Sequence, residues 1–519
     1  MRELPEITVR DASHDVLLRA GVKIMTGNAG SSELPVLANL PNDLTYIPVL
    51  QESVAVAIAD GYAQLAGDPV AVLLHAAAGL GNAAGQIVNA ARSGSPLVLL
   101  VGRQHRTLLT GAPFVDSYGL ELRELIKRAY APQRAADAPE LLAQACHLAQ
   151  LPPRGPVLVT VPADDWLATA GPYTVKPKPV AAHPDQRVLG ELASALLKAR
   201  SPAFVVGAEV DREHAVQAMM DVADAVCADV WHAPMSWRRS AHETHPRFKG
   251  HLPPAPTKAA KALEDSGYDL VIAFGTVDTY HTPPENGLMP PMPYRWVVSD
   301  APDVLARTPG VSILGDVGAA LHVLSGMFSG IVRPAPTAPR AGHPPTSATG
   351  QVYHAIRQVL PDAILAEEAP AARPDLHAHH PIDSVHGGGY YTPAAGTLGG
   401  GLAGSIGIAL ARPDQQVVAV VGDGSAMYTI QALWTAAQVS PRLVIVVLDN
   451  RGYETMRSVA RHIDAGNLPG LDIHGLNWPH LAAGFGVPAR TVDAMGDLRE
   501  ALRAAEAADG AFLIHVPIS

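Results

Sequence analysis

Two polar side chains follow apolar stretches in the last third of the chain, and their spacing suggests a shared site. Asp423 lies between two glycines directly after "VVAVV", and Asn450 ends the stretch "LVIVVLDN", 27 positions later. If the two stretches are neighbouring parallel strands, their carboxyl ends bring a carboxylate and an amide oxygen to one edge of a sheet. Such oxygen ligands suit Mg²⁺, and the glycines allow a phosphate to approach the backbone closely. The ordinary alternative is that Asp423 caps a helix.

The elements that must position these residues follow from the distribution of apolar runs. Short apolar stretches such as "VAVLLH", "AFVVG" and "LVIAFG" alternate with Ala-rich helical stretches along the whole chain. This alternation is typical of parallel sheets covered by helices on both faces. Pro-rich stretches at 174–186 and 332–350 are typical of linkers. We therefore predict an α/β protein with three doubly wound parallel-sheet domains, at 1–180, 185–333 and 345–519.

The first and third domains resemble copies of one unit. The stretch "AVLLH" (71–75) aligns with "AVVGD" (419–423), and each is followed by small residues, a helical stretch and a second apolar strand. His75 and Val101 are 26 positions apart, as are Asp423 and Asp449. Two related domains could face each other across one ligand, although βαβ units in general look alike.

Composition and charge limit the classes of partner. The chain has 519 residues, 48% of them hydrophobic and 17% charged, and its net charge is −11. An acidic chain without a Lys/Arg run is a poor match for nucleic acid or an anionic membrane. Its apolar runs are too short to span a bilayer, and "MRELPEITVRDAS" has no apolar core typical of a secretory signal. The two cysteines form no spaced motif, which favours a cytoplasmic location.

The combination of Gly-Asp-Gly with an asparagine after the next strand resembles the diphosphate-binding motif of thiamine diphosphate enzymes. The resemblance implies thiamine diphosphate and Mg²⁺ as cofactors, with Ca²⁺ able to substitute for the metal. It also implies that the metal is bound by Asp423, Asn450 and the carbonyl of Gly452. Further cofactor-binding residues implied by the motif are Gly422, Gly424, Ser425 and Tyr453. The family usually has two asparagines where this chain has Asp449 and Asn450, and the motif gives no role to Asp449.

Two more positions match cofactor-binding residues of the same family. Glu52 follows "YIPVLQ" at the start of an Ala-rich helical stretch, where a glutamate also suits the helix dipole. By resemblance, Glu52 binds the pyrimidine N1′ of a cofactor held by a second subunit, which implies a homo-oligomer, either dimer or tetramer, with its active site at the subunit interface. Leu398, in "AAGTLGGGLAGSIG" (394–407), matches the bulky residue that supports the bent cofactor. The surrounding small residues are expected to let backbone pack against a ring system.

Longer stretches extend the resemblance to the 2-oxo acid decarboxylases, and most closely to the benzoylformate decarboxylase group. Matching stretches include "GNAGSSELPVLANLP" (27–41) and "GDGSAMYTIQALWTAAQ" (422–438). The implied activity is the non-oxidative decarboxylation of a 2-oxo acid to an aldehyde and CO₂, with carboligation as a side activity. Ser31 would bind the substrate carboxylate, while His75 and His281 would handle protons. Histidine suits that work because its ordinary pKa, about 6.5, lies near neutral pH.

The sequence departs from this group in the region expected to hold the substrate side chain. Ala29 replaces a proline, Thr392 and Val459 replace two phenylalanines, and Thr455 replaces a small residue. These changes remove aromatic lining, although Phe114 falls in a segment that could refill the space. An aromatic 2-oxo acid is the first expectation, with an aliphatic or branched one as the second.

Three other interpretations stay open. An acetolactate synthase-like carboligase often binds FAD, but the single glycine in "FVVGAEVD" argues against a dinucleotide loop and against FAD. A cofactor-binding paralogue without catalysis is disfavoured because the acidic, amide and leucine positions of the motif are all retained. Histidines at 375–389 raise the possibility of zinc, but they lack a recognised spacing, and a mobile loop over the active site is the preferred interpretation. The stretch "HETHPRFKGH" (242–251) is likewise not a zincin motif.

Overall fold

The structure is a computed structural model, and it separates into two compact units. It describes residues 7–111, 116, 122, 125–180, 182–284, 287–331, 333, 344–383, 389–466 and 468–518. One unit, here called the paired unit, combines 1–179 with 358–372 and 392–519. The other, the central unit, comprises 180–357 and 373–391.

The first sheet of the paired unit is parallel, with the strand order β2-β1-β3-β4-β6-β5. Its strands are β1 (Ile24–Gly27), β2 (Thr45–Pro48), β3 (Val70–Leu74), β4 (Leu97–Arg103), β5 (Arg128–Tyr130) and β6 (Val157–Pro162). Its helices are α1 (Val9–Arg19), α2 (Leu34–Leu37), α3 (Glu52–Ala66), α4 (Ala76–Ser93) and α5 (Ala138–Gln150). The predicted alternation of strand and helix is confirmed for this part of the chain.

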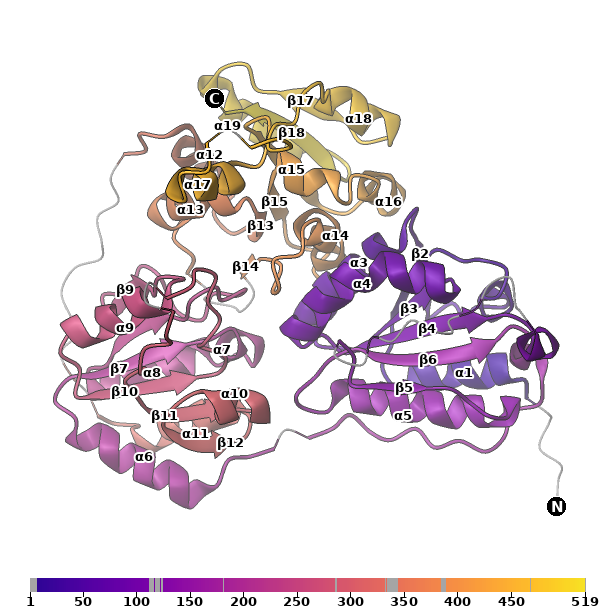
Figure 1. The fold of residues 1–519 in the computed structure, drawn as a ribbon, viewed down its shortest axis with the longest axis horizontal. Helices are drawn as coiled ribbons and strands as arrows, with labels where there is room; N and C mark the ends of the chain where they lie inside the picture. Colours follow the sequence, from indigo (N-terminus) through magenta and orange to yellow (C-terminus); the bar gives the residue numbers. More distant parts are fainter. Residues whose placement is uncertain are drawn as a thin grey trace. The chain divides into compact units, whose positions relative to one another are not determined.

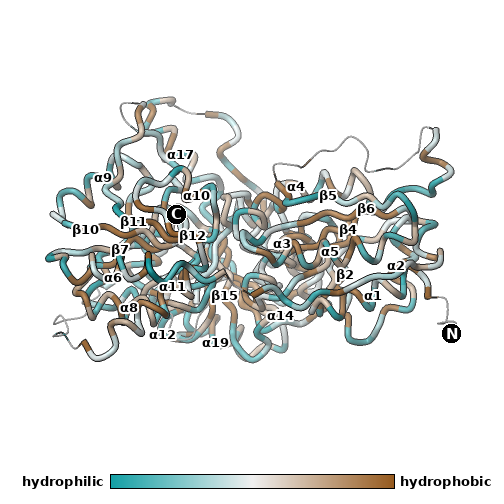
Figure 2. Tube along the Cα trace, turned by 90° about the horizontal axis from the view of Figure 1, so that it is seen from below, coloured by the Kyte–Doolittle hydropathy of each residue, from teal (hydrophilic) through white to brown (hydrophobic). Residues whose placement is uncertain are grey.

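Helices cover both faces of this sheet, as the continuous apolar strands require. Alternate strand residues, such as Leu73 and Leu100, share a buried cluster with Leu17 of α1 and Leu142 of α5. On the opposite face α3 packs against β1 and β3, and α4 packs against β4 (Figure 1). Figure 2 shows hydrophobic colouring along β4 and β6, which lie inside these helical layers. The strands β1, β3, β4 and β6 are therefore buried along nearly their whole length, whereas the outer strands β2 and β5 are partly exposed.

The second sheet of the paired unit has the parallel strand order β13-β15-β16-β18-β17. Its strands are β13 (Ile364–Glu368), β15 (Val417–Gly422), β16 (Leu443–Asp449), β17 (Ala489–Thr491) and β18 (Phe512–Pro517). Its helices are α14 (Gly400–Ala411), α15 (Asp423–Met427), α16 (Ala432–Val439), α17 (Glu454–His462), α18 (Trp478–Gly484) and α19 (Leu498–Glu506). The order repeats that of β1-β3-β4-β6-β5, in agreement with the predicted duplication.

Helices α3 and α14 hold the two sheets of the paired unit together through glycines (Figure 1). A Cβ atom on Gly61 would lie 2.1 Å from the carbonyl oxygen of Gly404, and one on Gly407 would lie 1.9 Å from that of Ile58. No side chain fits at such distances, so the glycines allow the two helix backbones to touch. The small residues of 394–407 were expected to approach a ring system, but Gly404 and Gly407 instead serve this helix contact.

The central unit contains a parallel sheet with the order β12-β11-β10-β7-β8-β9. Its strands are β7 (Pro202–Val206), β8 (Asp229–His232), β9 (Phe248–His251), β10 (Leu270–Phe274), β11 (Tyr294–Ser299) and β12 (Val311–Leu314), and β14 (Tyr390–Tyr391) also belongs to this unit. Its helices are α6 (Gln186–Lys198), α7 (Glu209–Arg212), α8 (Val216–Val226), α9 (Pro256–Asp265), α10 (Pro302–Arg307), α11 (Val317–Met327) and α13 (Arg373–His379), and α12 (Ala348–Val359) ends across the unit boundary. Phe204 and Phe274 face a cluster with α6, α8 and α11, whereas Val205 and Ala273 face α9.

The histidine-rich segment is only partly described, and its first half is not a loop. Residues 373–379 form helix α13, so the interpretation of 375–389 as a loop is wrong for this part. Residues 384–388 lie outside the described residues. Within the part of the chain that the structure describes, no helix is both long and apolar enough to cross a membrane.

Candidate active site

Asp423 and Asn450 lie directly beyond the carboxyl ends of two neighbouring strands. Strands β15 and β16 run parallel in register, with Gly422 beside Leu448, so the residues that follow them lie at the same edge of the sheet. Asp423 is buried at the first position of α15, where Gly422 is the N-cap. Its Oδ2 accepts a hydrogen bond of 2.7 Å from the backbone N–H of Gly452. The structure thus joins Asp423 to the loop after β16.

The polar atoms at this edge form a set that fits a divalent cation. Burial raises the pKa of Asp423 to about 6, with a further contribution from Asp449, while the backbone amides of Gly424 and Gly452 act in the opposite direction. Asn450 Oδ1 is buried and has no hydrogen-bond partner among the described residues. A desolvated carboxylate and an unpartnered amide oxygen are both costly without a ligand. The chemistry of these donors therefore fits Mg²⁺.

Two of the glycines around this site are required by close contacts. A Cβ on Gly424 would lie 2.5 Å from the Tyr453 ring, and one on Gly452 would lie 2.2 Å from the carbonyl oxygen of Leu471. At Gly422 the nearest atoms would be 3.8 Å away, which is ordinary contact. The motif therefore packs the start of α15 tightly against Tyr453. Ser425, the remaining predicted residue of the motif, is buried within α15.

Asp449, which the motif left without a role, pairs with the neighbouring strand. Its Oδ2 lies 3.0 Å from Nε2 of His515 on β18, and its Oδ1 accepts a hydrogen bond from the backbone N–H of Arg451. Both carboxylate oxygens of Asp449 therefore have partners within the protein. It still contributes to the raised pKa of Asp423.

The loop that carries Leu398 is anchored by a glutamate that the sequence did not reveal. Glu368, buried at the end of β13, accepts hydrogen bonds of 2.8 and 2.7 Å from the backbone amides of Gly399 and Gly401. On the other side, Gln86 of α4 donates to the carbonyl oxygen of Leu398 at 2.9 Å. These contacts fix the backbone at Leu398. The double-acid stretch "AEE" was the available signal, but its amide partners lie 31 and 33 positions away.

Glu52 begins α3 and is 7% exposed. Asn82 of α4 donates a hydrogen bond of 3.1 Å to its Oε2, and a Cβ on Gly79 would lie 3.1 Å from its Oε1. Gln51, rather than Glu52, provides the side-chain cap of the helix by accepting from Ser53 N. The carboxylate is thus held between the starts of α3 and α4, where it is not a solvated surface charge.

His75 ends the strand-to-helix connection after β3, and a buried acid fixes its orientation. His75 Nδ1 lies 2.8 Å from Glu33 Oε2, and Ser32 Oγ lies 3.3 Å from the same nitrogen. Because Glu33 accepts from Nδ1–H, Nε2 is the ring nitrogen left to exchange a proton. Glu33 was not predicted; the only signal was an acid beside a proline in "SSELP". Ser31 is exposed in the turn just before Glu33, and a Cβ on neighbouring Gly30 would lie 2.1 Å from His75 Nδ1.

The remaining predicted residues differ in how far they are exposed. His281 is exposed in the central unit, where its backbone N–H donates to the Pro254 carbonyl at 3.0 Å, so its role stays a prediction. Thr392 is buried, whereas Val459 on α17 is 40% exposed. Thr455 lies in the first turn of α17. Phe114 falls outside the described residues.

Comparison with known families assigns all three parts of the chain to one kind of protein. Residues 7–121 match the thiamine pyrophosphate enzyme N-terminal TPP binding domain, and 189–324 match the central domain of the same enzymes. Residues 376–516 match their C-terminal TPP binding domain. The edge that carries Asp423 and Asn450 lies within this third match.

Individual relatives extend over nearly the whole chain. A benzoylformate decarboxylase of Pseudomonas aeruginosa is 36% identical over 98% of both chains. A putative acetolactate synthase large subunit of Mycobacterium tuberculosis is 29% identical over 97% of this chain and 98% of its own. Among solved structures, a thiamine diphosphate-dependent 4-hydroxybenzoylformate decarboxylase of Rhodococcus jostii has a TM-score of 0.93 at 34% identity, covering 99% of each chain. A benzoylformate decarboxylase of Polynucleobacter necessarius has a TM-score of 0.92 at 28% identity, covering 99% of this chain and 98% of its own.

Proposed function

Since the chain belongs to the thiamine pyrophosphate enzymes, we propose that it decarboxylates an aromatic 2-oxo acid to the corresponding aldehyde and CO₂. Bound thiamine diphosphate supplies a nucleophilic carbon for the keto group and accepts the electron pair released when CO₂ leaves. The protein is a 2-oxo acid decarboxylase, a carbon–carbon lyase. What we propose beyond this reaction class is an aromatic side chain for the substrate and a role for each residue of the site.

Asp423, Asn450 and the backbone carbonyl of Gly452 hold Mg²⁺ in this proposal, and the metal holds the diphosphate. The observation that carries it is the pairing of a desolvated carboxylate with an unpartnered amide oxygen, as far as the described residues extend, beyond two adjacent strands. Glu52 would donate a hydrogen bond from its protonated carboxyl group to N1′ of the pyrimidine ring. Leu398 would support the cofactor from a backbone fixed by Glu368.

Three other side chains act on the substrate in this proposal. Ser31 binds the carboxylate, and His75 exchanges a proton through Nε2 while Glu33 holds Nδ1. His281 is the second proton-handling group, on the resemblance alone. A general acid–base of this kind typically contributes about 10²–10⁴-fold to the rate. His75→Ala is therefore expected to lower kcat by that order, and His480→Ala, at an exposed position of α18, serves as the matched control.

The test is a panel of 2-oxo acids with thiamine diphosphate and Mg²⁺, in which CO₂ and aldehyde are measured. Benzoylformate and 4-hydroxybenzoylformate represent aromatic substrates, and pyruvate and 3-methyl-2-oxobutanoate represent aliphatic and branched ones. Turnover restricted to the last two would contradict an aromatic substrate without contradicting decarboxylation. Acetolactate formed from pyruvate would favour the carboligase. The relative named for that reaction is 29% identical to this chain, whereas the benzoylformate decarboxylase is 36% identical.

We further propose that the active enzyme is a cytoplasmic homo-oligomer, a dimer or tetramer, in which Glu52 serves a cofactor held by another subunit. The support is the family resemblance together with the position of Glu52 at the start of α3. Light scattering gives the oligomeric state. Mixing inactive Glu52→Gln and Asp423→Asn chains tests the shared site, because mixed oligomers regain intact sites only if the two residues act across subunits.

A further inference from the structure

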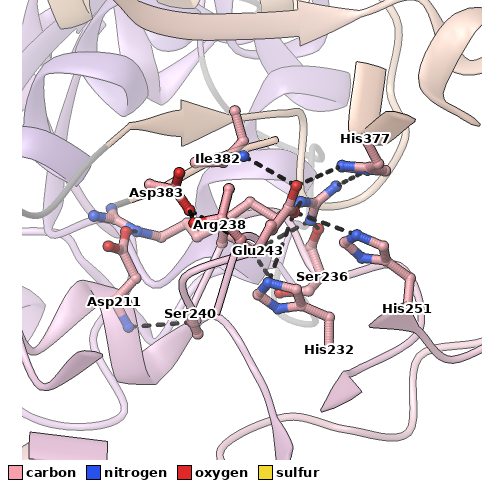
Figure 3. Close-up of polar contacts among 12 residues, drawn as sticks. Asp211, His232, Ser236, Arg238, Ser240, Glu243, His251, His377, Ile382 and Asp383 are labelled. Carbon is pink, nitrogen blue, oxygen red and sulfur yellow. Dashed lines mark hydrogen bonds and ion pairs between the residues drawn. The ribbon is translucent and has the colours of Figure 1, made fainter. Parts of the chain in front are cut away.

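The central unit contains a cluster of histidines and one glutamate that the proposed reaction does not use. His232 ends β8 and His251 ends β9, and the two residues are partners in the parallel register of these strands. Their rings therefore stack, with centroids 4.9 Å apart and an interplanar angle of 9°. Glu243, from the connection between the strands, approaches both rings (Figure 3). Three side chains from three segments thus meet at the end of this sheet.

One carboxylate oxygen of Glu243 and the ring nitrogens of the two histidines converge at ion-pair distances, but without the geometry of a hydrogen bond. Glu243 Oε1 lies 3.3 Å from His251 Nε2 and 3.9 Å from His232 Nε2. In the described structure, Glu243 Oε1, His251 Nε2 and both ring nitrogens of His232 are buried without a hydrogen-bond partner. Unsatisfied buried polar atoms are rare and costly, and several at one point require an explanation. An ion bound between them would supply a partner for Glu243 Oε1, His251 Nε2 and His232 Nε2, and would leave only His232 Nδ1 of these four atoms without one.

The other oxygen of the glutamate is already held in place. Ile382 N donates to Glu243 Oε2 at 3.0 Å, and His377 Nδ1 lies 3.2 Å from the same oxygen (Figure 3). Arg239 Nη2 donates to His377 Nε2 at 2.9 Å, so Nδ1 carries the proton that His377 gives to Glu243. The carboxylate is thereby oriented with Oε1 directed at the two imidazoles. Outer contacts of this kind orient the ligands of metal sites.

We propose that His232, Glu243 and His251 form a binding site for a divalent transition metal, with Zn²⁺ as the reference ion. Two imidazoles and one carboxylate are a donor set that zinc uses with a further ligand. The three donor atoms lie within 4.8 Å of one another. Tetrahedral zinc with bonds of about 2.0–2.1 Å needs ligand atoms about 3.3 Å apart, so rotation of the imidazoles closes the remaining gap. The side chain of His251 is 27% exposed, so the cluster lies close to solvent on the side of β9.

An ion pair between Arg239 and Glu243 is the rival arrangement. Arg239 Nε lies 3.3 Å from Glu243 Oε1, yet neither atom has a hydrogen-bond partner in the described residues. Such a pair would leave both nitrogens of buried His232 unsatisfied, whereas a metal takes the lone pair of Nε2. The positive charge of Arg239 opposes a cation, which weakens binding. The two arrangements therefore differ in metal content, and this is directly measurable.

A metal at this site would hold the edge strand of the central sheet to its neighbours. β9 is the edge strand, and the metal would join it to β8, to the connection between them and, through His377, to α13. Its role is structural, so loss of the metal is expected to lower the folding stability of the central unit and to leave the catalytic groups in place. Metal binding contributes directly to folding stability where ligands from separate segments are brought together.

The experiment uses full-length protein without an affinity tag, stripped with a chelator and then reloaded with thiamine diphosphate and excess Mg²⁺. Co²⁺ is added, unbound ion is removed, and elemental analysis and visible spectra are recorded. We expect about one Co²⁺ per chain, with the intense absorption of four- or five-coordinate cobalt. Zn²⁺ should displace it, whereas excess Mg²⁺ should not.

Variants connect the signal to these residues. His232→Gln and the more exposed His251→Gln should each abolish the cobalt spectrum, and His242→Gln, at the position next to Glu243, should retain it. Circular dichroism and retained Mg²⁺-dependent binding of thiamine diphosphate show that the variants are folded. Absence of bound Co²⁺ and Zn²⁺ in the folded wild type, or equal binding by folded His251→Gln, would overturn the proposal in favour of the ion pair. Neither result bears on decarboxylation.

Discussion

Replacement of Asp423 by asparagine should stabilise the cofactor-free protein while it removes the response to cofactor. Burial raises the pKa of Asp423 from 3.8 to about 6, which means that the folded protein disfavours the charged carboxylate. A shift of about 2 pKa units corresponds to about 3 kcal/mol at 1.36 kcal/mol per unit. Asparagine keeps a similar shape and an acceptor for the Gly452 amide, but it carries no charge to desolvate.

The sign of the effect depends on pH in a defined way. Because the pKa is raised in the folded state, protonation of Asp423 favours folding below 3.8, and this contribution is lost as the pH rises through about 6. Wild type and Asp423→Asn should therefore have similar stability near pH 4. The variant should be more stable by up to about 3 kcal/mol above pH 7.

The assay is thermal unfolding of both proteins in a chelator, across the range from pH 4 to pH 8, without and with thiamine diphosphate and Mg²⁺. A difference of about 3 kcal/mol corresponds to several degrees in the midpoint for domains of this size. Added cofactor should reverse the order at pH 8, since only wild type binds the metal. Asp414→Asn, at an exposed position after α14, controls for the loss of one negative charge. A difference independent of pH, or a less stable cofactor-free variant at pH 8, would refute the reasoning.

Two further predictions concern positioning and packing. Glu33→Gln should lower kcat by roughly 10–100-fold, equivalent to loss of a charge-assisted hydrogen bond of about 1.5–3 kcal/mol, because His75 Nδ1 loses its carboxylate partner. A kcat of folded Glu33→Gln within a few-fold of wild type would contradict this positioning role. Gly61→Ala should lower the unfolding midpoint, because its Cβ would lie 2.1 Å from Gly404 O; overpacking of this kind costs about 1–3 kcal/mol or more. Gly190→Ala in α6, where no described atom lies within 4 Å of the new Cβ, should leave the midpoint unchanged or raise it, and equal effects would contradict the helix contact.

Sequence reasoning succeeded where the signal was local. Asp423 and Asn450 each follow a strand that is apolar up to its last residue, and the carboxyl ends of adjacent parallel strands meet by the rules of the fold. The same rules predicted the alternation of strands and helices and the likeness of the first and third domains, and the strand orders of the two sheets agree with that likeness. These conclusions need only the local pattern of apolar residues and the parallel-sheet rule, and no knowledge of contacts between distant parts of the chain.

The missed residues depend on partners far away in the chain. Glu33 gains its role from His75, 42 positions later, and Glu368 from amides more than 30 positions later. Neither acid has a pattern of its own, because a buried carboxylate in a loop or at a strand end looks like any other before its donors are known. The helix α13 was missed for a different reason, since its seven residues contain a single buried apolar side chain and hence no readable period.

One rule of parallel sheets underlies both the candidate active site and the cluster in the central unit. Beyond β15 and β16 the rule brings together two oxygen donors, Asp423 and Asn450, whereas at the ends of β8 and β9 it brings together two imidazoles. Donor type then decides the ion, because oxygen ligands select Mg²⁺ and imidazole favours zinc or cobalt. The two sites should therefore load independently: saturating Mg²⁺ with cofactor fills the first without displacing Co²⁺ from the second. If Mg²⁺ displaced Co²⁺ from the cluster, or Co²⁺ displaced Mg²⁺ from the cofactor site, the difference in donor chemistry would not be enough to separate the two ions.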